Sequence, residues 1–330
     1  MLAWPAFATL KRSCPDAAIY ALVPQYTADM AHLCPWIDEV IIDEGEGPVS
    51  LSRKFALHHF DAMITLISTN RVAWAGFLAR IPYRLAPATK LFQFLYNNRL
   101  LQRRSRSGKP EFAYNIDIAY QFLMDNGVSI AEESATGDYL PTGIKRPLLT
   151  FPAGDSARLR EQLCQQHGIH SESKLVFIHP GSGGSANNLT LEQYIELANG
   201  LDCPGPLAII ITAGPGEKES ASLIVAGITT HPATVLSPTD GLLSLAQHLQ
   251  LADLFISCST GPLHIAGALN RPTAAFYPRH RSGSPLRWQT LNAPNKRLIF
   301  TPPDTVDAKY VAGIDIATAI MQINQHFLVC

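Results

Sequence analysis

Residues 255–278 read FISCSTGPLHIAGALNRPTAAFYP, and this stretch decides the fold. The apolar run over residues 251–257 ends in polar turn residues, which is typical of a buried β-strand. Pro262 suits the first turn of a helix, because the N–H group that proline lacks would have no partner there. Pro272 ends that helix, and residues 273–277 have the composition of a second strand. The stretch therefore predicts a strand, a helix and a second strand, the repeating unit of an α/β sheet.

The same alternation of short apolar strands and helical patterns continues along almost the whole chain, which predicts an α/β fold with mainly parallel sheets. Strands are expected at residues 18–23, 39–42, 62–67, 83–85, 175–179, 207–212, 234–236, 254–257 and 274–277. Residues 137–152 are rich in Pro, Gly and Thr, which indicates a linker. We therefore expect two doubly wound, Rossmann-like domains, 1–150 and 151–306. A helical segment, 307–330, is expected to pack back across the hinge.

The composition fits an ordinary globular protein of 330 residues, of which 47% are hydrophobic and 16% charged. At roughly 100–200 residues per domain, this length corresponds to two domains. The formal net charge is −1, so no overall field attracts nucleic acid. The six cysteines form no Cys-x-x-Cys pair, which favours a reducing cytoplasm over a disulfide framework or a zinc site. We expect neither a membrane span nor a secretion signal.

One basic run departs from the near balance of acidic and basic residues in the whole chain. The stretch RLLQRRSRSGKP, residues 99–110, has five basic residues and no acidic one. One hypothesis is that these charges belong to a solvated loop. The other is that Arg99, Arg103 and Arg104 bind a polyanionic acceptor or an anionic membrane surface. At such a surface each basic residue contributes about 1 kcal/mol.

Two loops of the second half carry ligand-binding residue types. In FIHPGSGGSANNLTLEQY, residues 177–194, glycines follow a strand, and their N–H groups make an anion-binding nest. The candidate residues there are Pro180, Gly181, Ser182 and Asn187. In AIIITAGPGEKE, residues 208–219, the strand delivers Glu217 to the edge where ligands of open α/β sheets gather. Glu217 accepts the two hydroxyls of a ribose there, or it is only a first-turn acid favoured by the helix dipole.

The third candidate loop precedes the helix that is predicted within residues 255–278. Ser259, Thr260 and Gly261 precede free N–H groups at a helix N-terminus, which bind anions. His264 lies in the first turn, where the dipole disfavours a charged imidazole, and a neutral ring still donates one N–H to a phosphate. The alternative for His264 is a packed core residue. Basic residues 279–281, after the next strand, clamp the same phosphates or are exposed loop charges. Together the three loops predict a nucleotide-diphosphate site.

These motifs resemble the bacterial heptosyltransferase family, which transfers heptose from ADP-heptose to the lipopolysaccharide core. The resemblance lies in FIHPGSGGSANNLTLEQY, AGPGEKE and SCSTGPLHIAGALNRPTAAFYP. In the first half, residues 14–41 and 60–86 also resemble conserved stretches of that family. The similarity covers nearly the whole chain and is most specific at residues 259–264.

The resemblance implies two Rossmann-like domains that face each other across a cleft, the GT-B architecture of glycosyltransferases. It implies that the C-terminal half binds the nucleotide-sugar donor and that the N-terminal half binds the acceptor glycan. It implies donor binding without a metal, no cofactor beyond the ADP-sugar substrate, and inversion at the anomeric carbon. We expect a cytoplasmic protein, with peripheral contact at the inner-membrane surface.

Three features depart from the family pattern. Family members usually begin with a strand and a Gly-Asp loop whose aspartate is the general base. This chain starts at MLAWPAFATLKRSCPDA, so that strand and base are expected to be missing. Asn187 stands where a lysine is common, and Ser259 stands where an aspartate is common. The base therefore stays unassigned: His264 has a supporting role, and Asp29 and Asp61 only lie near first-half loops.

The leading hypothesis is an inverting glycosyltransferase that uses an ADP-sugar and a lipopolysaccharide-core or related surface-glycan acceptor. Because the base loop is missing, a catalytically impaired nucleotide-sugar or glycan binding protein of the same fold is the alternative. A nucleotide-sugar epimerase is a third hypothesis. It is disfavoured because no paired carboxylates stand at a suitable spacing for its acid–base work.

Overall fold

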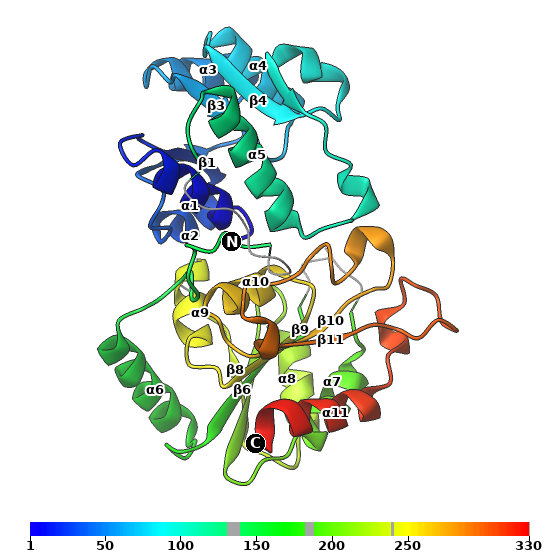
Figure 1. The fold of residues 1–330 in the computed structure, drawn as a ribbon. Helices are drawn as coiled ribbons and strands as arrows, with labels where there is room; N and C mark the ends of the chain where they lie inside the picture. The colour runs from blue at the N-terminus through cyan, green and yellow to red at the C-terminus, as the bar shows by residue number, and fades with distance from the viewer. Residues whose placement is uncertain (131–138, 182–187, 239–240, 330) are drawn as a thin grey trace. The chain divides into compact units, whose positions relative to one another are not determined.

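The computed structural model describes residues 1–130, 139–181, 188–238 and 241–329. The chain forms two compact units, Leu2–Lys145 and Arg146–Cys330 (Figure 1). Both units consist of parallel strands and helices, so the predicted α/β class is confirmed. Within the described residues, no helix is both long enough and apolar enough to span a bilayer.

The C-terminal unit contains a six-stranded parallel sheet in the order β11-β10-β9-β6-β7-β8. Because the chain adds strands outward from β6 and then, in the other direction, from β9, the order reverses between these two strands. The carboxyl ends of β6 and β9 therefore form a switch point, where ligands of open α/β sheets bind. The strands are β6 (Lys174–His179), β7 (Leu207–Thr212), β8 (Ala233–Leu236), β9 (Leu254–Cys258), β10 (Thr273–Phe276) and β11 (Arg297–Phe300).

Helices cover both faces of this sheet, because side chains along a strand point alternately to its two sides. Val176, Ile178, Ile209, Ile211 and Ile256 belong to one buried cluster with residues of α7, α8 and α11. α9 contacts both α6 and α10, and these three helices lie on the other side of the sheet (Figure 1). The helices are α6 (Ala153–His167), α7 (Leu191–Gly200), α8 (Lys218–Gly227), α9 (Gly241–Leu249), α10 (Gly261–Ala268) and α11 (Ile316–Ile323).

The C-terminal helix α11 packs within its own unit. Ile316, Ala319 and Ile323 lie in the same core cluster as the sheet, and α11 contacts α7. Ile320 lies so close to Gly200 that a Cβ atom there would meet its Cδ1 at 2.6 Å. These contacts place α11 on α7, and the packing of residues 307–330 back across the hinge stays a prediction.

The N-terminal unit has two separate parallel sheets, one of β1 and β2 and one of β3, β4 and β5. Thr69 caps α4 by accepting a hydrogen bond from the Val72 N–H. The strands are β1 (Tyr20–Pro24), β2 (Glu39–Asp43), β3 (Ala62–Ile64), β4 (Tyr83–Pro87) and β5 (Asn98–Leu100). The helices are α1 (Trp4–Ser13), α2 (Ala28–His32), α3 (Pro48–Ala56), α4 (Asn70–Leu78) and α5 (Glu111–Asp125), with short 3-10 turns η2 (Leu91–Leu95) and η3 (Arg104–Arg106).

Candidate functional site

The three candidate loops of the C-terminal unit follow three neighbouring strands. β6 pairs with β7 on one side and with β9 on the other, and all three run parallel. At its end, His179 lies opposite Ser257 of β9. The loops that begin after β6, β7 and β9 therefore emerge side by side at the carboxyl edge of the sheet.

Glu217 is held between the loops that follow β6 and β7. Its Oε2 accepts a hydrogen bond of 2.8 Å from the Gly214 N–H. The carboxylate also fills the space beside Gly181, where a Cβ atom would lie 2.1 Å from Oε2. Glu217 precedes α8, yet its side chain caps none of that helix's N–H groups. This placement argues against the first-turn acid and for a carboxylate presented at the sheet edge.

His179, the last residue of β6, is a buried neighbour of this carboxylate that the sequence reasoning missed. It is 7% exposed, and its Nδ1 lies 3.0 Å from Thr212 Oγ1 in a hydrogen bond. Burial lowers the pKa of His179, and the negative charge of Glu217 opposes that shift. The signal in the sequence was a polar residue ending an otherwise apolar strand just before Pro180.

The glycine-rich loop is described only at its two ends. Pro180 and Gly181 are buried, and the Pro180 carbonyl accepts a 2.7 Å hydrogen bond from Asn188 Nδ2. Ser182 and Asn187, the other two residues that the sequence proposed for this loop, lie outside the described residues.

Two polar atoms at the start of α10 are buried and unpaired. Thr260 occupies the N-cap position and is 5% exposed, but its side chain caps no N–H group. Thr260 Oγ1 and His264 Nδ1 have no hydrogen-bond partner among the described residues. Ser259 is partly buried and Gly261 is exposed. Buried polar groups without partners are rare in native proteins, so this helix start has the character of a ligand site.

Burial also sets the protonation state of His264. It lowers the pKa of the imidazole to about 3, so the ring is neutral at physiological pH. The ring faces Trp288, with 6.3 Å between the two ring centroids. A neutral ring with an unpaired Nδ1 has one nitrogen available to a ligand, and the free N–H groups of α10 lie beside it.

The basic residues that follow β10 have mostly structural roles. Arg279 forms an ion pair with Asp304 at 2.9 Å and donates hydrogen bonds to the carbonyls of Pro302, Pro303 and Val306. His280 accepts a hydrogen bond from the Ser282 N–H. Arg279 therefore holds the 302–306 segment, which argues against a phosphate clamp there.

The basic run of the N-terminal unit, residues 99–110, also contains an arginine with a structural role. Arg104 forms an ion pair with Glu111 and donates to Gln102 Oε1 at 2.8 Å. Arg99 and Arg103 are exposed and make no ion pair with a described residue. Of the three arginines proposed to bind an anion, Arg104 is thus already engaged, and the other two face solvent.

The carboxylates weighed as a general base are not gathered into a site. Asp61 is exposed and precedes β3, so it lies at the amino end of that strand, away from the ligand-binding edge. Asp29 is exposed on α2. Asp43, at the carboxyl end of β2, pairs with Arg71, which lowers its pKa and makes it a weaker base. The base remains unassigned.

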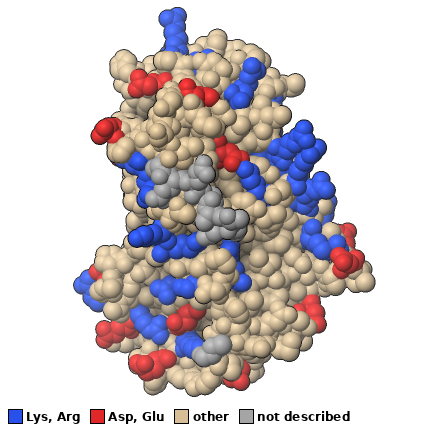
Figure 2. Space-filling view, viewed as in Figure 1, with Lys and Arg blue, Asp and Glu red and all other residues tan. Residues whose placement is uncertain are grey.

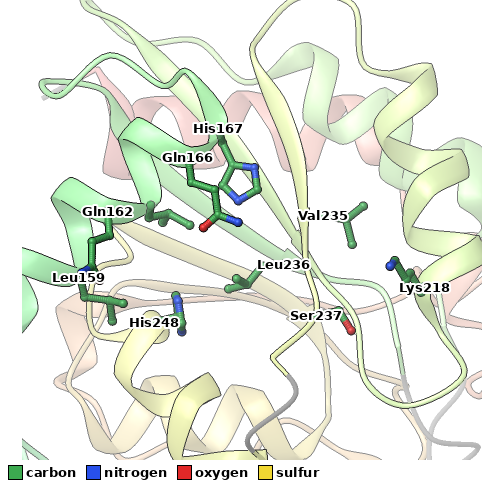
Figure 3. Close-up of a pocket in the computed structure, with 10 residues that line it drawn as sticks. Leu159, Gln162, Gln166, His167, Lys218, Val235, Leu236, Ser237 and His248 are labelled. Atoms are coloured by element: carbon green, nitrogen blue, oxygen red, sulfur yellow. The ribbon is translucent and has the colours of Figure 1, made fainter.

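A cavity of about 290 Å³ lies elsewhere in the C-terminal unit, between α6, β8 and α9 (Figure 3). His167, Gln162 and His248 line it, and Lys218 of α8 reaches its margin. His248 Nδ1 is bonded to the Ser244 carbonyl, and His167 Nδ1 is bonded to Thr234. Because Glu217, Thr260 and His264 are not among its lining residues, the cavity is separate from the candidate site.

Comparison with known proteins agrees with this geometry. The model of glycosyltransferase family 9 (heptosyltransferase) matches residues 50–300. A putative glycosyltransferase of Haemophilus influenzae is 41% identical over 329 residues, which cover 98% of this chain and 92% of that protein. Lipopolysaccharide heptosyltransferase 2 of Escherichia coli is 23% identical over 292 residues, 84% of this chain and 78% of that protein.

The fold agrees as well. The solved structure of Escherichia coli ADP-heptose lipopolysaccharide heptosyltransferase II has a TM-score of 0.75 and 19% identity, and covers 99% of this chain and 94% of that one. This match confirms the predicted GT-B type fold. From its motifs, its fold and its relatives, the chain belongs to glycosyltransferase family 9, the heptosyltransferase family.

Proposed function

We propose that the chain is an inverting glycosyltransferase that transfers heptose or a related sugar from an ADP-sugar to a lipopolysaccharide-core or related surface-glycan acceptor. The observation that carries the proposal is the buried Thr260 hydroxyl without a partner at the start of α10. Membership of glycosyltransferase family 9 supports the reaction class. The names of the relatives support the choice of donor and acceptor.

The donor nucleotide binds residues 151–306 in this proposal, and the acceptor binds residues 1–150. Glu217 accepts the ribose hydroxyls, for which its carboxylate is already held in place by the Gly214 N–H. Thr260, the free N–H groups of α10 and one ring nitrogen of His264 bind the diphosphate. Ser259 and the loop of Pro180 and Gly181, with Ser182 and Asn187, complete the donor site.

The reaction is a single displacement. The acceptor hydroxyl oxygen forms a bond to the anomeric carbon and gives up its proton to water, since no protein base is assigned. The bond from that carbon to the diphosphate oxygen breaks in the same step, which inverts the configuration. Negative charge develops on the departing ADP. Fixed N–H donors aimed at that charge stabilise the transition state more than water does, because they need no reorganisation. We propose that these donors, without a metal ion, carry this task.

The acceptor is part of a membrane glycolipid in this proposal, so the protein acts in the cytoplasm with peripheral contact at the inner-membrane surface. The exposed Arg99 and Arg103 supply positive charge on the N-terminal unit. A binding protein without turnover remains the second candidate. It is favoured by the lack of an assigned general base among the described carboxylates.

Calorimetry with ADP and ADP-heptose, followed by transfer assays, tests the proposal. We expect both ligands to bind, and we expect the Thr260→Val and His264→Ala variants to bind at least tenfold more weakly. Thr229→Val, an exposed threonine just before β8, is the matched control and should bind normally. If neither ADP nor ADP-heptose gives a heat of binding, the proposed donor site is contradicted. Binding with no transfer to any lipopolysaccharide core favours the second candidate.

A further inference from the structure

The segment between Asp61 and Glu111 has an unusual charge. Its 49 residues, 62–110, include nine Lys or Arg and no Asp or Glu, whereas the whole chain has 26 basic and 27 acidic residues. Four of the nine cations are used within the protein. Arg71, Arg104 and Lys109 pair with acids outside the segment, and Arg84 donates to the carbonyls of Leu95 and Ile81.

The other five cations are exposed, and none makes an ion pair with a described residue. Figure 2 shows a group of Lys and Arg side chains on the surface of the N-terminal unit. The five residues are Arg80, Lys90, Arg99, Arg103 and Arg106.

The same segment exposes an apolar surface. It holds seven of the eighteen large hydrophobic side chains that the described residues expose. A surface helix normally turns polar residues outward, but α4 presents Trp74, Phe77 and Leu78, which are 37%, 45% and 44% exposed. These three share one helical face, since they are spaced three and four residues apart.

The η2 turn extends this apolar face. The Phe94 ring lies 6.5 Å from the Trp74 ring between centroids, and the Phe77 ring lies 5.9 Å from it. Phe94 is 68% exposed, and Leu91, one turn earlier, is 97% exposed. Trp74, Phe77, Leu78, Leu91 and Phe94 therefore form one surface, which we call the aromatic patch. Arg80 and Lys90 flank it directly along the chain.

We propose that the aromatic patch docks the N-terminal unit on an anionic bilayer, with the five exposed cations placed on lipid phosphates. Charge decides between a bilayer and a protein partner. A protein partner would have to combine an apolar surface with acidic groups opposite Arg80 and Lys90, whereas an anionic bilayer offers negative phosphates beside an apolar interior. Tryptophan and phenylalanine beside basic residues are typical of surfaces that lie in the membrane interface.

This proposal deepens the proposed function by naming the surface that would bring the enzyme to a membrane acceptor. Its test needs neither donor nor acceptor, so the two proposals fail separately. Loss of ADP binding with vesicle binding intact contradicts the proposed function only. Loss of vesicle binding with ADP binding intact contradicts only the docking surface.

The experiment is co-sedimentation of the full chain with vesicles of phosphatidylcholine, with and without phosphatidylglycerol. We expect binding to the anionic vesicles that weakens as salt is added. The Leu91→Ser/Phe94→Ser variant should bind at least tenfold more weakly. Val49→Ser/Leu57→Ser is the matched control, since both residues are exposed on the same unit outside the patch.

Charge is tested in the same assay. Arg103→Gln/Arg106→Gln should bind anionic vesicles at least fivefold more weakly. Arg53→Gln/Arg158→Gln, two exposed arginines outside the segment, should bind as the unaltered chain does. Tryptophan emission should shift to shorter wavelength with anionic vesicles, and Trp74→Phe should lose that shift.

Three results overturn the proposal. The first is no binding to anionic vesicles at low salt. The second is equal binding by the aromatic-patch variant and its control. The third is binding to inorganic polyphosphate without binding to vesicles, which would identify a soluble polyanion as the ligand.

Discussion

At the scale of single residues, the candidate donor site consists of groups that the protein leaves unpaired or holds under constraint. Thr260 Oγ1 and His264 Nδ1 are buried without partners, and the Glu217 carboxylate occupies the space beside Gly181. Leaving a buried donor or acceptor unpaired costs about 1–3 kcal/mol. A ligand that pairs with these atoms recovers that cost, so the site is prepared for binding at the expense of stability.

A side chain at position 181 should weaken ligand binding rather than destabilise the fold. In Gly181→Ala, the new Cβ would lie 2.1 Å from Glu217 Oε2, so the carboxylate must move. We expect ADP to bind about tenfold more weakly, because the displaced carboxylate no longer meets the ribose, while the unfolding midpoint changes little. Calorimetry and thermal unfolding measure the two. Gly205→Ala is the control, since nothing lies within 4 Å of a Cβ there. Equal ADP affinity in both variants would contradict this role of Glu217.

His264 should make the fold sensitive to acid. Its folded pKa is about 3, against an ordinary value of 6.5, so the folded state resists its protonation. The unfolded chain takes up that proton as the pH falls below 6.5, and stability is lost from there down to the folded pKa. The loss at pH 5 is about 2 kcal/mol relative to pH 7.

Urea unfolding at pH 7 and pH 5 measures this effect. His264→Gln, which keeps a polar side chain but does not titrate, should lose about 2 kcal/mol less than the unaltered chain on acidification. An identical loss in both proteins would show that the ring is solvated in the folded state.

At the scale of elements, α7 fixes one end of the glycine-rich loop that follows β6. Thr190 Oγ1 accepts a hydrogen bond of 3.2 Å from the Gln193 N–H, and Gln193 Oε1 accepts one of 3.0 Å from the Thr190 N–H. This capping box satisfies two N–H groups at the helix start. Gln193 Nε2 also donates to the Ala312 carbonyl at 2.8 Å, which ties α7 to the segment before α11.

Thr190→Ala should therefore destabilise the C-terminal unit by about 1 kcal/mol, the usual cost of losing an N-cap. The measurement is the free energy of unfolding in urea. Thr305→Ala, an exposed threonine outside the helices and strands, is the control and should change it by less than about 0.5 kcal/mol. A loss of the same size in both variants would mean that the capping box contributes nothing of its own.

The elements also show what sequence patterns can and cannot predict. β6 and β7 were predictable because continuous apolar runs, residues 175–178 and 207–211, are typical of strands that are buried on both faces. β11 was missed because Arg297–Phe300 has a weak pattern, with Ile299 45% exposed. The expected strand over residues 62–67 was too long, since the chain leaves the sheet after Ile64 and Ile67 is 75% exposed.

The limits at the candidate site have the same physical origin. The sequence pattern placed Glu217 and Thr260 in loops after strands and His264 in the first turn of a helix, because strand ends and helix starts are local features. The contact between Glu217 and Gly181, and the unpaired state of Thr260, depend on how distant segments pack. For the same reason, the periodicity of residues 307–330 predicted a helix with a buried face, but not that α7 would cover it.

At the scale of the whole molecule, average properties conceal local ones. A net charge of −1 excluded a general attraction to polyanions, yet residues 62–110 contain nine basic residues and no acidic one. The two units also differ in their sheets. The C-terminal unit has one six-stranded sheet, whereas the N-terminal unit has sheets of two and three strands.

The strand order of the six-stranded sheet has a consequence for the newly made chain. Val176 of β6 pairs with Leu254 of β9, 78 positions later in the sequence (254 − 176). At a synthesis rate of about 5–20 residues per second, the ribosome needs roughly 4–16 seconds to make that interval. During this delay one edge of β6, whose residues 175–179 are buried in the folded protein, has no permanent neighbour. The nascent polypeptide is then most exposed to aggregation and most in need of a chaperone.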